Sequence, residues 1–146
     1  NLFPVLEELN IGFVAFSPLA NGFLTDAYSN QTFTEPTDYR SIMPQFKPEG
    51  YKENEKLIKL VRKYASEKDA TPAQISLAWL LAKKPYIVPI PGSRSVERLR
   101  ENAKAADIHL LPQEVKEIDE ALEQMNLLVF DGSVLPDESK QEAYRK

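Results

Sequence analysis

Two short polar stretches, each after an apolar run, hold the side chains best suited to bind a charged ligand. The first is residues 17–24 (SPLANGFL), which begins with the hydroxyl of Ser17 and contains Gly22. A glycine lets the backbone approach a ligand closely, and α/β proteins bind ligands at the carboxyl ends of parallel strands. Taken alone, however, the stretch is better explained as a strand followed by a turn.

The second stretch is residues 90–95 (IPGSRS), directly before an expected helix. Backbone N–H groups at a helix N-terminus bind phosphate readily. The hydroxyls of Ser93 and Ser95 and the guanidinium group of Arg94 would add to such a phosphate cradle. The pattern therefore indicates an anion site at the end of a second strand.

Three polar residues follow on that helix at positions i, i+3 and i+4, namely Arg98, Glu101 and Asn102. A guanidinium group can hold a phosphate or stack on a base. A carboxylate and an amide can hydrogen-bond to the edge of adenine. The alternative, which this helix alone favours, is a solvated face with a serine cap and an ordinary Arg–Glu pair.

Composition excludes several other kinds of chemistry. The 18 basic and 22 acidic residues give a net charge of -4, which provides no broad positive field for nucleic acid or anionic lipid. Without cysteine there are no disulfides, thiolate metal ligands or thiol nucleophiles. We find no cluster with metal-ligand spacing, and interpret the single His109 as structural. No apolar run approaches the roughly 18 residues of a membrane span, so we expect a cytoplasmic protein.

The elements that must position these residues follow from apolar periodicity. Apolar spacing of three to four predicts helices, and unbroken apolar runs predict strands buried on both faces, as in a parallel sheet. The order is a helix at 2–9, a strand at 13–16, a loop at 25–52, helices at 54–65 and 71–82, a strand at 87–90, and helices at 96–106 and 112–125.

Two features of this α/β pattern stand out. Thr71, Pro72 and Gln74 form a strong helix start with a capping box, and the helix they open is apolar nearly all round, so it must be buried on several sides. Pro89 argues against the second strand, because a central strand rarely tolerates a missing N–H. Two parallel strands cannot cover their own faces and edges, so the predicted sheet is incomplete.

The motifs SPLxxGxLT, TPAQISLAWLL and IPGSxxxxRLxEN, in this order, resemble the aldo/keto reductase family. The resemblance runs from about Leu2 to Gln124 and includes DYRSIMPQF within the loop. It also accounts for Pro89, because the last barrel strand of the family is proline-rich. The family fold is a (β/α)8 TIM barrel, and residues 1–146 would be its C-terminal part. They would supply the last two strands with their helices and be incomplete alone.

The resemblance implies an NADP(H) site. Ser17, Leu19, Gly22 and Leu24 would line the pyrophosphate, Ser93, Arg94 and Arg98 would hold the ribose 2′-phosphate, and Glu101 and Asn102 would hold adenine. The neighbouring Pro18, Ile90, Pro91 and Gly92 complete the implied cofactor-binding set. Many relatives carry lysine in place of Gly92, so Arg94 or Arg98 would have to compensate. Ala20 also replaces a frequent glycine.

The family's catalytic aspartate, tyrosine, lysine and histidine lie in the first half of the barrel, and we find none of their motifs here. The resemblance therefore implies an oxidoreductase parent that reduces aldehydes and ketones with NADPH, and a chain that is inactive alone. It would pair with the missing half or self-associate. The alternatives are a non-catalytic nucleotide-binding or interaction half-barrel that self-associates, and a regulatory relative that binds cofactor with little turnover.

Overall fold

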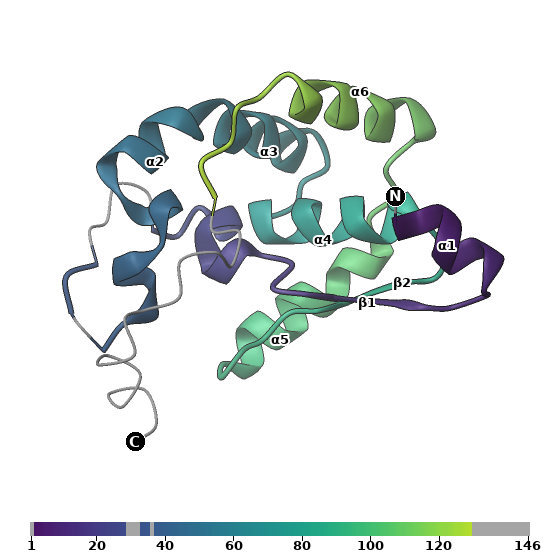
Figure 1. The fold of residues 1–146 in the computed structure, drawn as a ribbon, viewed down its shortest axis with the longest axis horizontal. Coiled ribbons are helices and arrows are strands. Elements are labelled where there is room, and N and C mark those ends of the chain that lie inside the picture. Colours follow the sequence, from purple (N-terminus) through teal and green to yellow (C-terminus); the bar gives the residue numbers. More distant parts are fainter. Residues whose placement is uncertain (1, 29–32, 36, 130–146) are drawn as a thin grey trace.

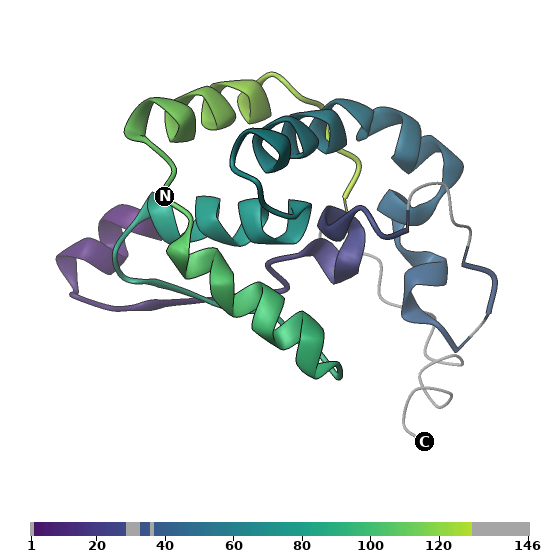
Figure 2. The same cartoon turned by 180° about the vertical axis from the view of Figure 1, so that it is seen from behind.

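The computed structural model describes residues 2–28, 33–35 and 37–129. The helices lie mainly on one side of two short strands, with α3 and α6 side by side on the outer flank, α4 between them and the strands, and α5 beside the strands (Figures 1 and 2). The elements, with η for 3₁₀ helices, are α1 (Leu2–Glu8), β1 (Phe13–Phe16), η1 (Ala20–Thr25), η2 (Tyr39–Ile42), η3 (Pro44–Phe46), α2 (Pro48–Glu53), α3 (Glu55–Glu67), α4 (Pro72–Lys83), β2 (Ile87–Ile90), α5 (Val96–Ala103), η4 (Lys104–Asp107) and α6 (Pro112–Glu123).

The predicted order of helices and strands is confirmed, with two corrections. The helix expected at 96–106 divides into α5 and η4. The segment 25–52, expected as a loop without regular structure, contains η2, η3 and α2. These elements surround a cluster of buried side chains, in which the rings of Phe33 and Phe46 lie 5.0 Å apart and nearly perpendicular. Hydrophobic contacts between residues distant in sequence therefore give this segment its structure, although its own sequence has no periodic pattern.

The strands β1 and β2 pair in parallel, as predicted, with Phe13 opposite Ile87 and Phe16 opposite Ile90. One face of this sheet is covered, because Ala15 and Ile87 are buried and α4 packs against β2. The opposite face is apolar and open to solvent. Its four side chains and their exposed fractions are Val14 at 61%, Phe16 at 80%, Val88 at 57% and Ile90 at 52%.

Pro89 lies within β2, opposite Ala15. The doubt that it raised about this strand is therefore resolved in favour of the strand. Proline is tolerated at a sheet edge, where its missing N–H costs no ladder hydrogen bond. In the sheet that the described residues form, β2 has β1 on one side only.

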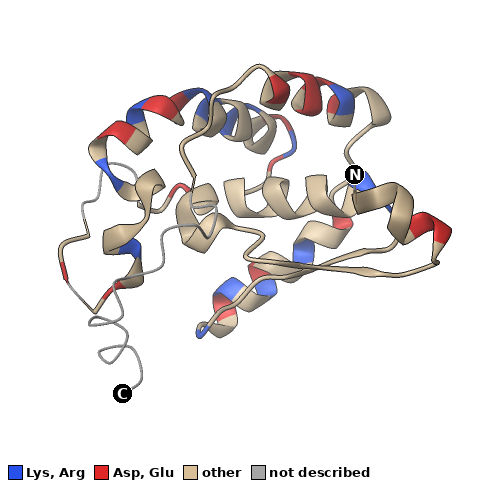
Figure 3. Cartoon of the chain, viewed as in Figure 1, with Lys and Arg blue, Asp and Glu red and all other residues tan. Residues whose placement is uncertain are grey.

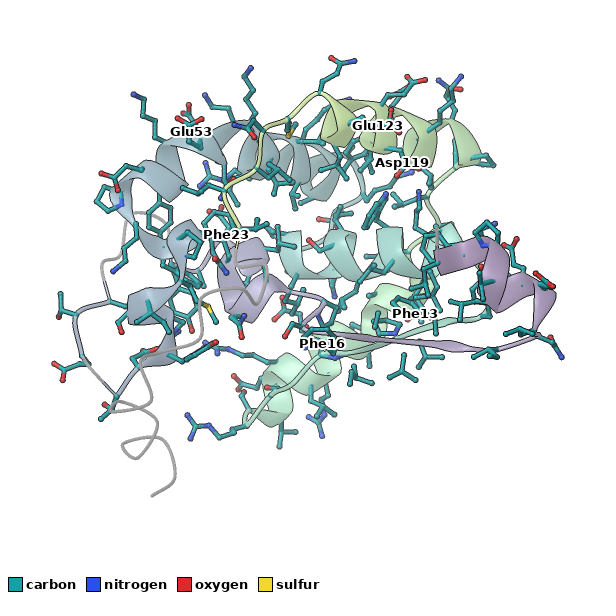
Figure 4. All side chains as sticks on the ribbon, viewed as in Figure 1. Phe13, Phe16, Phe23, Glu53, Asp119 and Glu123 are labelled. Carbon is teal, nitrogen blue, oxygen red and sulfur yellow. The ribbon has the colours of Figure 1, made fainter. Side chains whose placement is uncertain are left out.

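Helix α4 joins the sheet to the outer helices, and its predicted capping box is present. The hydroxyl of Thr71 accepts a hydrogen bond from the Gln74 N–H, and the Gln74 side chain accepts one from the Thr71 N–H. Its residues 73–78 are buried, while Leu81 in the last turn is 37% exposed. Asp119 of α6 lies over α4 (Figure 4) and accepts a hydrogen bond of 2.9 Å from Trp79 Nε1.

Charged side chains lie mainly on the outer helices, whereas the strands carry none (Figure 3). Within the described ranges, no helix is both long enough and apolar enough to cross a membrane.

Candidate cofactor site

The carboxyl ends of β1 and β2 meet at one edge of the sheet, because the strands are parallel and in register. A cavity of about 580 Å³ opens at this edge, between the turn after β1 and helix α5. Eleven of the thirteen residues predicted to bind cofactor line it, namely Ser17, Pro18, Leu19, Gly22, Ile90, Pro91, Gly92, Ser93, Arg98, Glu101 and Asn102. The structure thus brings together two stretches that are about 70 residues apart in sequence.

The turn after β1 is wound into left-handed backbone conformations. Ser17 and Ala20 both have φ of 48°, Asn21 has 57° and Gly22 has 94°. Hydrogen bonds of 2.9 Å from the Ala20 N–H to the Ser17 carbonyl, and from the Gly22 N–H to the Leu19 carbonyl, close this turn. A left-handed conformation costs a residue with a side chain roughly 1–2 kcal/mol. Glycine does not carry this cost, which explains why it suits the position that Ala20 occupies here.

Gly22 lines the cavity and is also constrained by a neighbouring ring. A Cβ built on Gly22 would lie 2.8 Å from Cε2 of Tyr28, closer than real contacts allow. The space beside Gly22 is therefore filled by the Tyr28 ring. Glycine is required there both by its positive φ and by that ring.

The second stretch begins α5 with a serine cap, as predicted. The Ser95 side chain accepts from the Arg98 N–H, and Ser93 accepts a hydrogen bond of 3.1 Å from the Ser95 N–H. Among the described residues, a Cβ at Gly92 would meet no atom within 4 Å. The structure thus leaves space for a side chain to begin at this position.

Glu101 is anchored to the start of α4. Thr71 Oγ1 donates a hydrogen bond of 2.6 Å to the Glu101 carboxylate, and Gln74 Nε2 donates one of 2.9 Å to its carbonyl. The carboxylate of Glu101 therefore bonds to Thr71, and not to Arg98 as the alternative for this helix face assumed. The capping box of α4 therefore holds Glu101 at the wall of the cavity, half-buried.

Two predicted site residues do not line this cavity. Leu24 packs against the cluster around Phe33 and Phe46 and against a second buried cluster on α3, α4 and α6. It lines a separate apolar cavity of about 380 Å³ between η1 and these helices. Its place in η1 turns it toward the protein interior, so the structure places it outside the candidate site. Arg94 lies on an open depression at the start of α5, together with Arg98 and both serines.

Sequence reasoning missed several residues that line the cavity. They are Phe16, Asn21, Thr25, Ala27, Tyr28 and Ala73. Thr25 donates a hydrogen bond of 2.6 Å to the Gly22 carbonyl and so braces the turn. Tyr28 belongs to a segment without periodicity, and only its aromatic ring close to the SPLxxGxLT stretch could have singled it out.

The electrostatics at Tyr28 are unusual for a tyrosine. Hydrogen bonding from Arg40, and to a smaller extent from Arg98, holds the pKa of its phenol below the ordinary value, although burial acts in the opposite direction. Arg40 is itself paired with Asp38, at 2.6 Å between Nη2 and Oδ2. The cavity is therefore lined by one guanidinium group, Arg98, and by a phenol that two guanidinium groups polarise.

Comparison with known proteins agrees with this geometry. The sequence model described as the aldo/keto reductase family matches residues 1–123, so the chain belongs to this family. It is 33% identical over 145 residues to aldo-keto reductase str7 of Strobilurus tenacellus, covering 92% of this chain and 43% of that relative. It is 39% identical over 122 residues to aldo-keto reductase yakc of Schizosaccharomyces pombe, named with NADP(+), covering 84% of this chain and 36% of that relative. The chain thus spans less than half the length of these relatives.

Two solved structures support the fold. A thermostable aldo-keto reductase in complex with the inhibitor epalrestat aligns with a TM-score of 0.55 at 31% identity, over 82% of this chain and 33% of its own. The glycerol dehydrogenase of Gluconobacter oxydans aligns with a TM-score of 0.76 at 20% identity, over 93% of this chain and 41% of its own. The neighbours are aldo-keto reductases with the TIM-barrel fold, and the chain itself is α/β with a small parallel sheet.

Proposed function

We propose that the chain is the C-terminal part of the (β/α)8 barrel of an NADP(H)-dependent aldo/keto reductase. It would hold the pyrophosphate and adenosine 2′-phosphate end of the cofactor, and the complete protein would reduce aldehydes or ketones to alcohols. The catalytic aspartate, tyrosine, lysine and histidine would come from the other half of the barrel. Loops after the seventh and eighth strands commonly form the phosphate site of such barrels.

The observation that carries the proposal is the cavity at the carboxyl ends of β1 and β2. Eleven of the thirteen expected cofactor residues line it. Ser93 and the N-terminus of α5 offer hydroxyl and N–H groups, and Arg98 offers positive charge. Glu101 and Asn102 lie on the same helix face, where they can meet an adenine edge. The cavity thus suits a phosphorylated nucleoside, with the charged groups near the start of α5.

The open face of the sheet supports a second candidate. Val14, Phe16, Val88 and Ile90 would face the interior of a closed barrel, and in this chain they meet solvent. A half-barrel that binds nucleotide without catalysis could cover this face with a second copy of itself. Both candidates require the face to be covered, and they differ in whether another half-barrel supplies the catalytic groups.

The test of the cofactor site is Arg98→Ala, with Arg100→Ala as a matched control. Both arginines are exposed on α5, but only Arg98 lines the cavity. Loss of a charge-assisted contact to the 2′-phosphate should weaken NADPH about tenfold to a hundredfold, with a much smaller effect on NADH. Fluorescence titration with both cofactors measures the two affinities. Equal losses for NADPH and NADH, or an equal effect of Arg100→Ala, would contradict the assignment.

A further inference from the structure

Tyr28 is held in one orientation by the folded segment that follows η1. Its ring lies against Gly22 and packs edge-to-face against Phe33, with ring centroids 5.5 Å apart. The guanidinium group of Arg40 lies 4.8 Å from the centre of the same ring. The Tyr51 hydroxyl donates a hydrogen bond to the Tyr28 carbonyl. Packing on the ring and a hydrogen bond to the backbone therefore fix Tyr28 at the wall of the cavity.

Tyr28 lines the same cavity as Arg98, so this segment and α5 share one site. Arg40 and Arg98 both act on the phenol, since each lowers its pKa. Arg40 is fixed by Asp38, through Nε–Oδ1 and Nη2–Oδ2 distances of 2.9 and 2.6 Å. A phenol can donate its O–H, and Tyr28 lines the cavity, so an acceptor bound there can receive this hydrogen bond.

We propose that Tyr28 is a further phosphate-binding residue, which donates its hydroxyl to the same phosphate that Arg98 binds and so favours a nucleotide carrying a 2′-phosphate. This inference rests on the proposed function and adds a group that no recognised motif supplied. Tyr28 and Arg98 line one cavity, the first from the segment after η1 and the second from helix α5. A phosphate bound between them would accept from both.

The polarisation of the phenol strengthens this donor. Because guanidinium groups hold the pKa of Tyr28 below its ordinary value of 10.0, the O–H gives up its proton more readily. Hydrogen bonds from such a donor to an anion are shorter and roughly twice as strong as bonds between neutral groups. A phosphate dianion is a strong acceptor for it.

The experiment compares Tyr28→Phe with the unsubstituted full chain, using adenosine 2′,5′-bisphosphate and 5′-AMP as probes in calorimetric titrations. Phenylalanine keeps the ring that packs on Gly22 and Phe33, and removes only the hydroxyl. We expect the affinity for the bisphosphate to fall about tenfold, and that for 5′-AMP to stay within about twofold. Tyr39→Phe, a phenol removed from the same segment but outside the cavity, should change neither affinity.

A double substitution identifies the shared phosphate. If Tyr28 and Arg98 bind one group, Tyr28→Phe should cost markedly less in the Arg98→Ala background than in the unsubstituted chain. Equal loss of both probes with Tyr28→Phe would show a structural role and overturn the inference. Unchanged bisphosphate affinity would also overturn it, while a loss with Arg98→Ala would leave the cofactor site standing. Absence of bisphosphate binding by the unsubstituted chain would overturn the cofactor site and this inference together.

Discussion

The open face of the sheet predicts that the 146-residue chain associates in solution. Fully burying a valine, isoleucine or phenylalanine side chain contributes about 1.5–3 kcal/mol. The exposed fractions of 52–80% on the four side chains of this face leave about 1–2 kcal/mol available at each of them. Two copies packed face to face would therefore gain about 8–16 kcal/mol, against an association cost of about 4–15 kcal/mol. The gain exceeds the cost for most combinations within these ranges, by up to about 12 kcal/mol, so association is favoured.

The perturbation is Val88→Lys, which places an ammonium group on this face. Losing the burial of this valine in both copies removes about 2–4 kcal/mol, so the dissociation constant should rise about 30-fold to 1,000-fold. Desolvation of the ammonium group adds to that loss. Val96→Lys is the control, because Val96 is 66% exposed but lies on α5, outside the sheet.

Sedimentation velocity over a range of concentrations measures both variants. We expect the unsubstituted chain and Val96→Lys to show concentration-dependent association, and Val88→Lys to shift toward the monomer. A monodisperse species of 16.6 kDa with cooperative unfolding in the unsubstituted chain would refute the reasoning. It would mean that the exposed apolar side chains do not require a partner.

Two further predictions concern activity and stability. The chain alone should show no NADPH-dependent reduction of an aromatic aldehyde, because the groups proposed to transfer a proton lie outside it, and clear turnover by the pure chain would disprove this. Burial, with a smaller contribution from Glu117, raises the pKa of Tyr64 to about 12, while an unfolded tyrosine titrates near 10. The folded state thus favours the neutral phenol, so stability is retained below about pH 10 and should fall by roughly 2–3 kcal/mol as the pH rises to about 12. Urea unfolding at several pH values should show this loss in the unsubstituted chain and a smaller one in Tyr64→Phe, and an equal loss in both would contradict it.

The sequence by itself determined the two strands, most of the helices and their order. The capping box at Thr71 and Gln74, the periodic apolar positions of the helices and the two apolar runs act over a few residues. Such local signals do not depend on the rest of the fold. The same holds for the serine cap before α5. The parallel pairing of β1 with β2 followed from their unbroken apolar runs, and this pairing brought the two polar stretches to one edge.

The tertiary structure alone decided which side chains reach the cavity. Leu24 follows the expected motif but turns into the core, because η1 packs against α3 and α4 through hydrophobic contacts. Glu101 is held by Thr71, 30 residues earlier, and neither residue predicts the other. Tyr28 reaches the site because an aromatic cluster assembles from residues spread between 23 and 51, and packing among distant rings leaves no periodic signal in the sequence. The local pattern also does not predict that one face of the sheet is left open, because burial depends on contacts distant in sequence.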